Sequence, residues 1–200
     1  MRDPDLLSYA AQARRVAALD FGVPPDDALP FLLLWGTRPE CVRETADRRY
    51  DVYLASGSDP WQARLQIGHE LFHRVAGAGN VFHWTHEMLA CVFSMRLLKR
   101  HGLADYAAQS EAQYECDAAA CPVSVLMSAD PWQGATYPVG YYGRAFVTGA
   151  KLAAAVGYPA LCRLARTVDD TGTPDFAAWL ESLPGNAERF AASAVLKETL

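Results

Sequence analysis

The central stretch of the sequence, residues 65–75, reads Leu65-Gln66-Ile67-Gly68-His69-Glu70-Leu71-Phe72-His73-Arg74-Val75. It contains the pattern H-E-x-x-H inside a predicted helix over 60–76, which Asp59 can cap and Pro60 can begin. Helical positions i and i+4 share one face, with Cβ atoms roughly 5–6 Å apart. Two imidazole nitrogens at that spacing can bind one Zn²⁺ ion at about 2.0–2.1 Å. We therefore expect His69 and His73 to be zinc ligands.

Glu70 directly follows the first histidine and lies about 100° further round the predicted helix. At the rim of a metal site, a carboxylate can act as a general base that takes a proton from a metal-activated water molecule. The flanking residues are apolar and favour a buried helix; they are Leu65, Ile67, Leu71, Phe72 and Val75. Glu70 is therefore the candidate catalytic base.

A third ligand is required, because a catalytic zinc ion usually has three protein ligands and one open position. The extended pattern H-E-x-x-H-x-x-G-x-x-H needs Gly at 76 and His at 79. The chain has Ala76 and Gly79 instead, which excludes a metzincin. The remaining candidates all follow within the next segment; they are His83, His86 and Glu87.

Glu87 is the preferred third ligand because it falls in the first turn of a predicted helix over 85–101, where the helix dipole favours a carboxylate. Small residues continue its face at spacings of three, four and seven: Ala90, Cys91 and Ser94. They would let this helix approach the H-E-x-x-H helix closely. We expect His83 and His86 to be bystanders or to support the ligands from outside.

The rest of the sequence predicts an α+β fold. A helix is expected over 5–19 and an irregular loop over 122–140. Short β-forming runs predict strands at 31–35, 41–45 and 50–54. Further helices are expected at 104–121, 141–156, 159–167, 174–182 and 186–198. This order predicts one domain over 1–200, with a small N-terminal mixed sheet and the active-site helix in 1–76 and a mostly helical lobe in 77–200.

Composition excludes several classes of protein. The 18 Lys and Arg residues against 23 Asp and Glu residues give a net charge of −5, which argues against nucleic acid as a partner. The sequence contains no run of 18 apolar residues, so it predicts no membrane-spanning helix. The N-terminus, Met1-Arg2-Asp3-Pro4-Asp5, lacks the features of a secretory signal, so we expect a cytoplasmic protein. The five cysteines form no C-x-x-C pair and are expected to be small buried side chains rather than disulfides.

The motif followed by Glu87 resembles the gluzincin metallopeptidases, in which two histidines and a downstream glutamate hold zinc. The pattern Glu87-x-x-Ala90-x-x-Phe93-x-x-x-Leu97-Leu98 is similar to the second-helix pattern of ImmA/IrrE-type peptidases. The segment Trp84-Thr85-His86-Glu87-Met88-Leu89-Ala90 is similar to the W-x-x-E-G-x-A segment of aminopeptidase-like (peptidase MA-like) gluzincins. The resemblance implies a zincin-like fold, zinc on His69, His73 and Glu87, and Glu70 as base and acid. The chain departs from the aminopeptidases in lacking a G-x-M-E-N substrate motif.

This resemblance implies a peptidase that acts on a peptide or protein substrate. Its tetrahedral oxyanion needs a donor besides zinc. Tyr141 and Tyr142 are the candidates, as a tyrosine has this role in related aminopeptidase-like enzymes. The sequence leaves three alternatives: an inactive zinc-binding interaction module or sensor, a zinc hydrolase of small amides, and a helical protein with a coincidental H-E-x-x-H. It predicts no oligomeric state.

Overall fold

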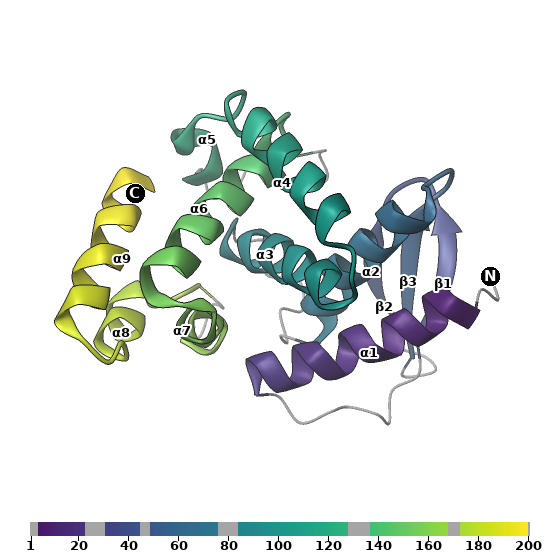
Figure 1. Cartoon of the computed structure of the whole chain (residues 1–200), viewed down its shortest axis with the longest axis horizontal. Helices are drawn as coiled ribbons and strands as arrows, with labels where there is room; N and C mark the ends of the chain where they lie inside the picture. Colours follow the sequence, from purple (N-terminus) through teal and green to yellow (C-terminus); the bar gives the residue numbers. More distant parts are fainter. Residues whose placement is uncertain are drawn as a thin grey trace. The chain divides into compact units, whose positions relative to one another are not determined.

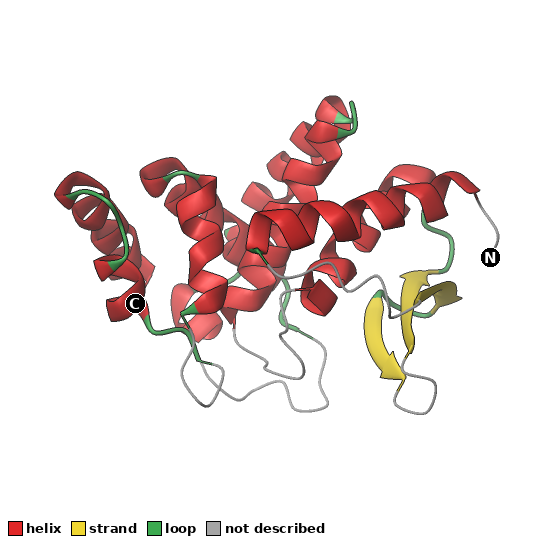
Figure 2. Ribbon diagram, turned by 90° about the horizontal axis from the view of Figure 1, so that it is seen from below, coloured by secondary structure: helices red, strands yellow, loops and turns green. Residues whose placement is uncertain are grey.

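The computed structural model describes residues 4–22, 31–44, 49–75, 84–127, 137–167 and 173–199. This part of the chain is mostly helical, and its strands form one small sheet, which agrees with the predicted α+β class (Figures 1 and 2). The chain divides into two compact units, Met1–Gly79 with Phe93–Ala107 and Asn80–Val92 with Ala108–Leu200. One continuous helix, α3 (Trp84–Arg100), has residues in both units.

The first unit contains the sheet and the H-E-x-x-H helix. It comprises α1 (Pro4–Phe21), β1 (Phe31–Gly36), β2 (Glu40–Glu44), β3 (Arg49–Ala55), α2 (Pro60–Val75), which is the H-E-x-x-H helix, the second half of α3 and the start of α4. The central strand β3 pairs in parallel with β1 and antiparallel with β2, so the sheet has the predicted mixed character.

The start of α2 is fixed by the residues that predicted it. The Asp59 side chain accepts hydrogen bonds from the backbone N–H groups of Trp61 and Gln62 at 2.8 and 2.9 Å, which satisfies two amides that a helix start leaves without intrahelical partners. Gln66 then joins α2 to the end of β3. Its Oε1 accepts from the Ala55 amide at 2.9 Å, and its Nε2 donates to the Ser58 hydroxyl at 3.0 Å.

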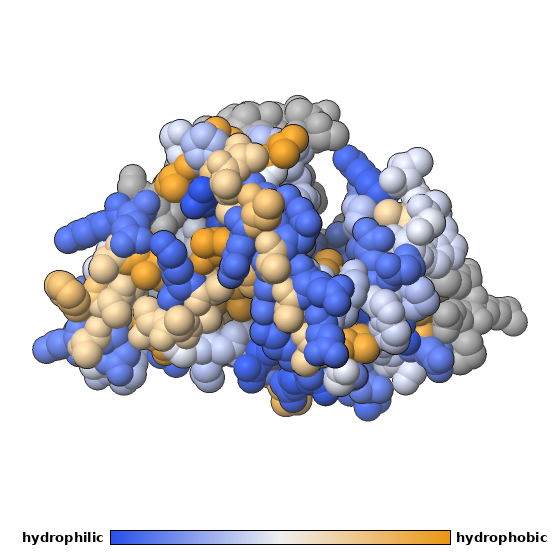
Figure 3. Space-filling view, turned by 45° about the horizontal axis from the view of Figure 1, so that its top comes forward, coloured by the Kyte–Doolittle hydropathy of each residue, from blue (hydrophilic) through white to orange (hydrophobic). Residues whose placement is uncertain are grey.

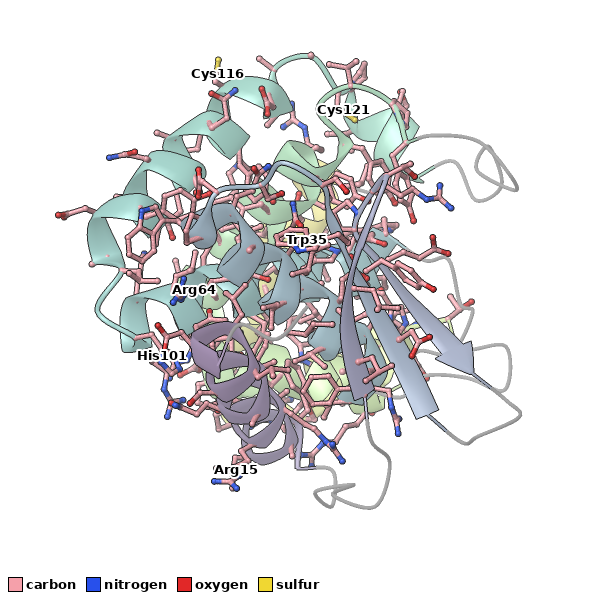
Figure 4. The ribbon with its side chains drawn as sticks, turned by 90° about the vertical axis from the view of Figure 1, so that its right-hand side faces the viewer. Arg15, Trp35, Arg64, His101, Cys116 and Cys121 are labelled. Atoms are coloured by element: carbon pink, nitrogen blue, oxygen red, sulfur yellow. The ribbon has the colours of Figure 1, made fainter. Side chains whose placement is uncertain are left out.

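Aromatic rings hold the helices of the first unit together. Phe21 of α1 contacts Phe72 of α2 with ring centroids 4.9 Å apart, and both rings contact Phe93 of α3. Near the other end of α1, Tyr9 contacts the His101 ring and the Arg64 guanidinium, two residues that Figure 4 shows beside this helix. Helix α2 is thus packed against both α1 and α3.

The second unit is helical throughout its described residues. Besides the first half of α3 it contains most of α4 (Ala104–Ala118), and then α5 (Val123–Met127), α6 (Tyr141–Val156), α7 (Tyr158–Arg163), the 3₁₀ turn η1 (Leu164–Arg166), α8 (Phe176–Glu181) and α9 (Asn186–Thr199). The expected loop over 122–140 is wrong at 123–127, where a short helix begins directly after Pro122, and α4 already ends at Ala118. Residues 128–136 of that segment lie outside the described residues.

The beginning of α6 is held tightly against the end of α4. A Cβ atom at Gly143 would overlap the backbone of Tyr114 and Ala118, so only glycine fits this contact. The Arg144 guanidinium donates to the carbonyl oxygens of Cys121 and Ala118 at 2.9 and 2.6 Å. These carbonyls close the C-terminal end of α4, and a planar guanidinium can satisfy both at once.

The expected burial of the cysteines is confirmed at three of the four whose side chains the structure describes. Cys91, Cys121 and Cys162 are buried free thiols as expected, whereas Cys116 is exposed on the outer face of α4. Hydrophilic and hydrophobic residues both lie on the face of the molecule in Figure 3, and the hydrophobic ones are contiguous in places. Within the described ranges, no one helix has the length and hydropathy needed to cross a bilayer, although Tyr141–Val156 and Tyr158–Arg166 meet that test together across a 115° bend.

Replacing Gly143 by Ala should destabilise the second unit by about 1–3 kcal/mol, because the added methyl group must displace the backbone of α4. Urea unfolding measures this change. The control is Ala154→Gly at an exposed position of the same helix, which should cost only about 0.5–1 kcal/mol. A Gly143→Ala protein as stable as the wild type would contradict the close contact.

The pH dependence of stability tests the environment of His101. Burial, followed by the charges of Arg100 and Arg64, lowers the pKa of this imidazole. The unfolded chain therefore binds a proton more readily than the folded protein, and stability is lost as pH falls from the unfolded pKa, roughly 6.5, toward the lower folded pKa. Urea unfolding of the metal-free protein at about pH 7 and about pH 5 should show a smaller loss for His101→Gln than for the wild type. Equal losses of stability in the wild type and the variant would show that His101 does not contribute to the pH dependence.

Candidate metal centre

Helix α2 places the two predicted histidine ligands one turn apart on the same face. The Nε2 atoms of His69 and His73 are 3.1 Å apart, and the two rings meet edge to face with centroids at 4.8 Å. Two nitrogens bound to one tetrahedral zinc at about 2.0–2.1 Å would be roughly 3.3 Å apart. The imidazoles therefore need little movement to bind one metal ion.

Glu87 completes the group from the first turn of α3, as the sequence predicts. One ligand atom from each of His69, His73 and Glu87 lies within 4.8 Å of the others. His69 is buried, and the other two are half-buried. The three residues are compatible with a bound metal ion, because two imidazoles and one carboxylate form a donor set that binds divalent metals.

Close packing of α2 on α3 brings the third ligand within reach. A Cβ atom at Gly68, next to His69, would lie 3.3 Å from the Cα atom of Ser94. Ser94 is seven residues after Glu87, two turns along the same helix face. The predicted close approach of the two helices is therefore present at Ser94. Ala90 and Cys91, on the same face, are completely buried.

Tyr137 is a site residue that sequence reasoning missed. Its hydroxyl donates a hydrogen bond to Oε1 of Glu87 at 3.1 Å, across fifty positions of the sequence. Its ring stacks on that of Tyr141 with centroids 4.6 Å apart and planes 13° apart. The available signal was the grouping of Tyr137, Tyr141 and Tyr142 directly before and at the start of a helix.

The two predicted tyrosines have different environments. Tyr141 is 2% exposed, whereas Tyr142 is 36% exposed and contacts the rings of Tyr137 and Tyr141 edge to face. Burial raises the pKa of Tyr141, and the charge of Glu87 raises it further, with smaller contributions from Cys121 and Cys91. A tyrosine is protonated at neutral pH even at its ordinary pKa of about 10, so the Tyr141 hydroxyl is a hydrogen-bond donor.

Two of the three remaining predicted residues, Glu70 and His86, lie in the described part of the chain. Glu70 is buried within α2, between the two histidines in sequence. His86 is buried in the first turn of α3 and is not one of the grouped ligands. His83 lies outside the described residues.

Removal of single side chains tests which residues hold the metal. Elemental analysis of the purified protein should find about one zinc ion per wild-type chain and far less after Glu87→Ala. His83→Ala and His86→Ala should retain the metal, because a catalytic zinc needs only one ligand besides His69 and His73. Loss of zinc in His83→Ala or His86→Ala, with zinc retained in Glu87→Ala, would identify that histidine as the third ligand.

Comparison of the chain with protein-family models, with curated proteins and with solved structures found no match. The interpretation of the site therefore depends on the H-E-x-x-H pattern and on the convergence of His69, His73 and Glu87.

Proposed function

We propose that this protein is a zinc-dependent hydrolase, specifically a gluzincin-type metallopeptidase with a zincin-like fold. The observation that carries the proposal is the convergence of His69, His73 and Glu87, with ligand atoms within 4.8 Å of one another. Two histidines and one glutamate are the protein ligands of known catalytic zinc sites and leave a fourth position open. A coincidental H-E-x-x-H would give no reason for a carboxylate from another helix to meet both imidazoles.

Zinc, when bound, supplies Lewis-acid chemistry, because it polarises a carbonyl group and acidifies a water molecule. Glu70, which follows His69 on α2, is the general base in this proposal. Its carboxylate takes the proton of the attacking water and returns it to the leaving amine. Burial of Glu70 supports this role, since a carboxylate held away from bulk water transfers protons to the substrate rather than to solvent.

Tyr141 is the better of the two candidates for the oxyanion donor. It is buried, and its ring stacks on that of Tyr137, whose hydroxyl donates to Glu87, so it lies close to a ligand of the candidate site and is held by packing. Tyr142 is more exposed and less constrained. The proposed substrate is a peptide or protein, in keeping with the gluzincin resemblance.

The Glu70→Gln variant tests the mechanism. It should retain zinc, because Glu70 is not a ligand, and lose peptide hydrolysis by about 10²–10⁴-fold, because general-base catalysis is removed. Cleavage of a peptide library, with and without chelator, measures the activity, and elemental analysis measures the metal. Glu115→Gln, which changes an exposed carboxylate on α4, is the matched control and should leave activity intact. Cleavage that survives Glu70→Gln would exclude Glu70 as the base.

A further inference from the structure

One contact of the metal centre has no part in the mechanism above: the hydrogen bond from Tyr137 to Glu87. A carboxylate can bind a metal ion through one oxygen or through both. The Tyr137 hydroxyl lies 3.1 Å from Oε1 of Glu87 and donates to it. That bond uses a lone pair of Oε1 and leaves the second oxygen of the carboxylate as the better ligand.

We propose that Tyr137 is a positioning residue that holds Glu87 as a one-oxygen ligand and so keeps one coordination position open for water. The proposal rests on the metal site proposed above and adds a residue that determines its geometry. Groups that hydrogen-bond to metal ligands orient them, and their removal typically lowers metal affinity 10–100-fold.

The surroundings of Tyr137 make its hydroxyl a fixed donor. Its ring contacts that of Tyr141, stacked at 4.6 Å, and that of Tyr142, edge to face at 5.2 Å. Pro138 follows it and restricts its backbone to extended conformations. The Pro138 carbonyl then accepts a hydrogen bond from the Tyr141 amide at 3.1 Å, which ties the short segment to the first turn of α6.

Helix α6, which follows this segment, packs closely against the end of α4. Gly140 has a left-handed φ of 80°, and a Cβ atom there would overlap the Asp117 carbonyl at the end of α4. Together with the Gly143 contact and the two hydrogen bonds from Arg144, this packing fixes the start of α6. The position of the Tyr137 hydroxyl is thus determined by the fold before any metal binds, which is the arrangement expected of a group that orients a ligand.

The test is the Tyr137→Phe variant, which keeps the stacked ring and removes only the hydroxyl. Competition of the metal-free variant with a chromophoric chelator for Zn²⁺ should show an affinity about tenfold or more below that of the wild type. With Co²⁺ in place of Zn²⁺, the visible absorption should weaken, because a carboxylate bound through both oxygens raises the coordination number above four. Tyr114→Phe, whose ring contacts Phe146 at 5.4 Å, is the control and should change neither result.

The outcomes separate this proposal from the proposed function. Wild-type affinity and spectrum in Tyr137→Phe, together with loss of metal in Glu87→Ala, would overturn the role of Tyr137 and leave the metal site standing. Equal losses of affinity in Tyr137→Phe and Tyr114→Phe would also overturn it, because they would indicate a general effect on folding. A wild-type protein that binds neither Zn²⁺ nor Co²⁺ would overturn both proposals. A protein that binds metal without cleaving peptides would contradict only the peptidase activity, because the readouts for Tyr137 are affinity and absorption.

Discussion

The close contact between α2 and α3 at Gly68 and Ser94 is the constraint on which the candidate metal centre depends. Side chains normally hold packed helices 8–10 Å apart. With no side chain at Gly68 and only a hydroxymethyl group at Ser94, the helix backbones can approach more closely. A short glutamate side chain two turns away on α3 can then reach the imidazoles of α2. A larger residue at either position would separate the ligands even though none of them had changed.

The charges of the three grouped residues suit a divalent cation. Neutral imidazole ligands carry no charge, so Glu87 is the anionic donor among the three grouped residues. Glu70, next to His69 in the sequence, is buried, and Glu87 is half-buried. Before a metal binds, a carboxylate in such a place needs hydrogen-bond donors, and Tyr137 is one of them. The same hydroxyl can therefore serve the metal-free and the metal-bound protein.

The elements of this site that could be predicted are those encoded over short distances in the sequence. The helix start at Asp59 and Pro60, the common face of His69 and His73, and the first-turn position of Glu87 all follow from helical periodicity and capping. Tyr137 could not be found in this way, because its partner lies fifty residues earlier and no periodic pattern links them. The short helix α5 was missed for another reason: a proline expected to end one helix can also begin the next. The zincin-like fold stays a prediction, since three strands and a helix pair are shared by many architectures.

The order of strands in the sheet bears on how the protein behaves in concentrated solution. Since β3 occupies the centre, β1 presents an outer row of backbone amides and carbonyls that pairs with no strand in the described part of the chain. Leu32 and Trp35 on this strand are 42% and 41% exposed. β1 contains no charged residue and no proline, the features that usually prevent one sheet from joining another. Intermolecular strand pairing along β1 is therefore the expected route of aggregation, and a single lysine in place of Leu32 is the simplest change to oppose it.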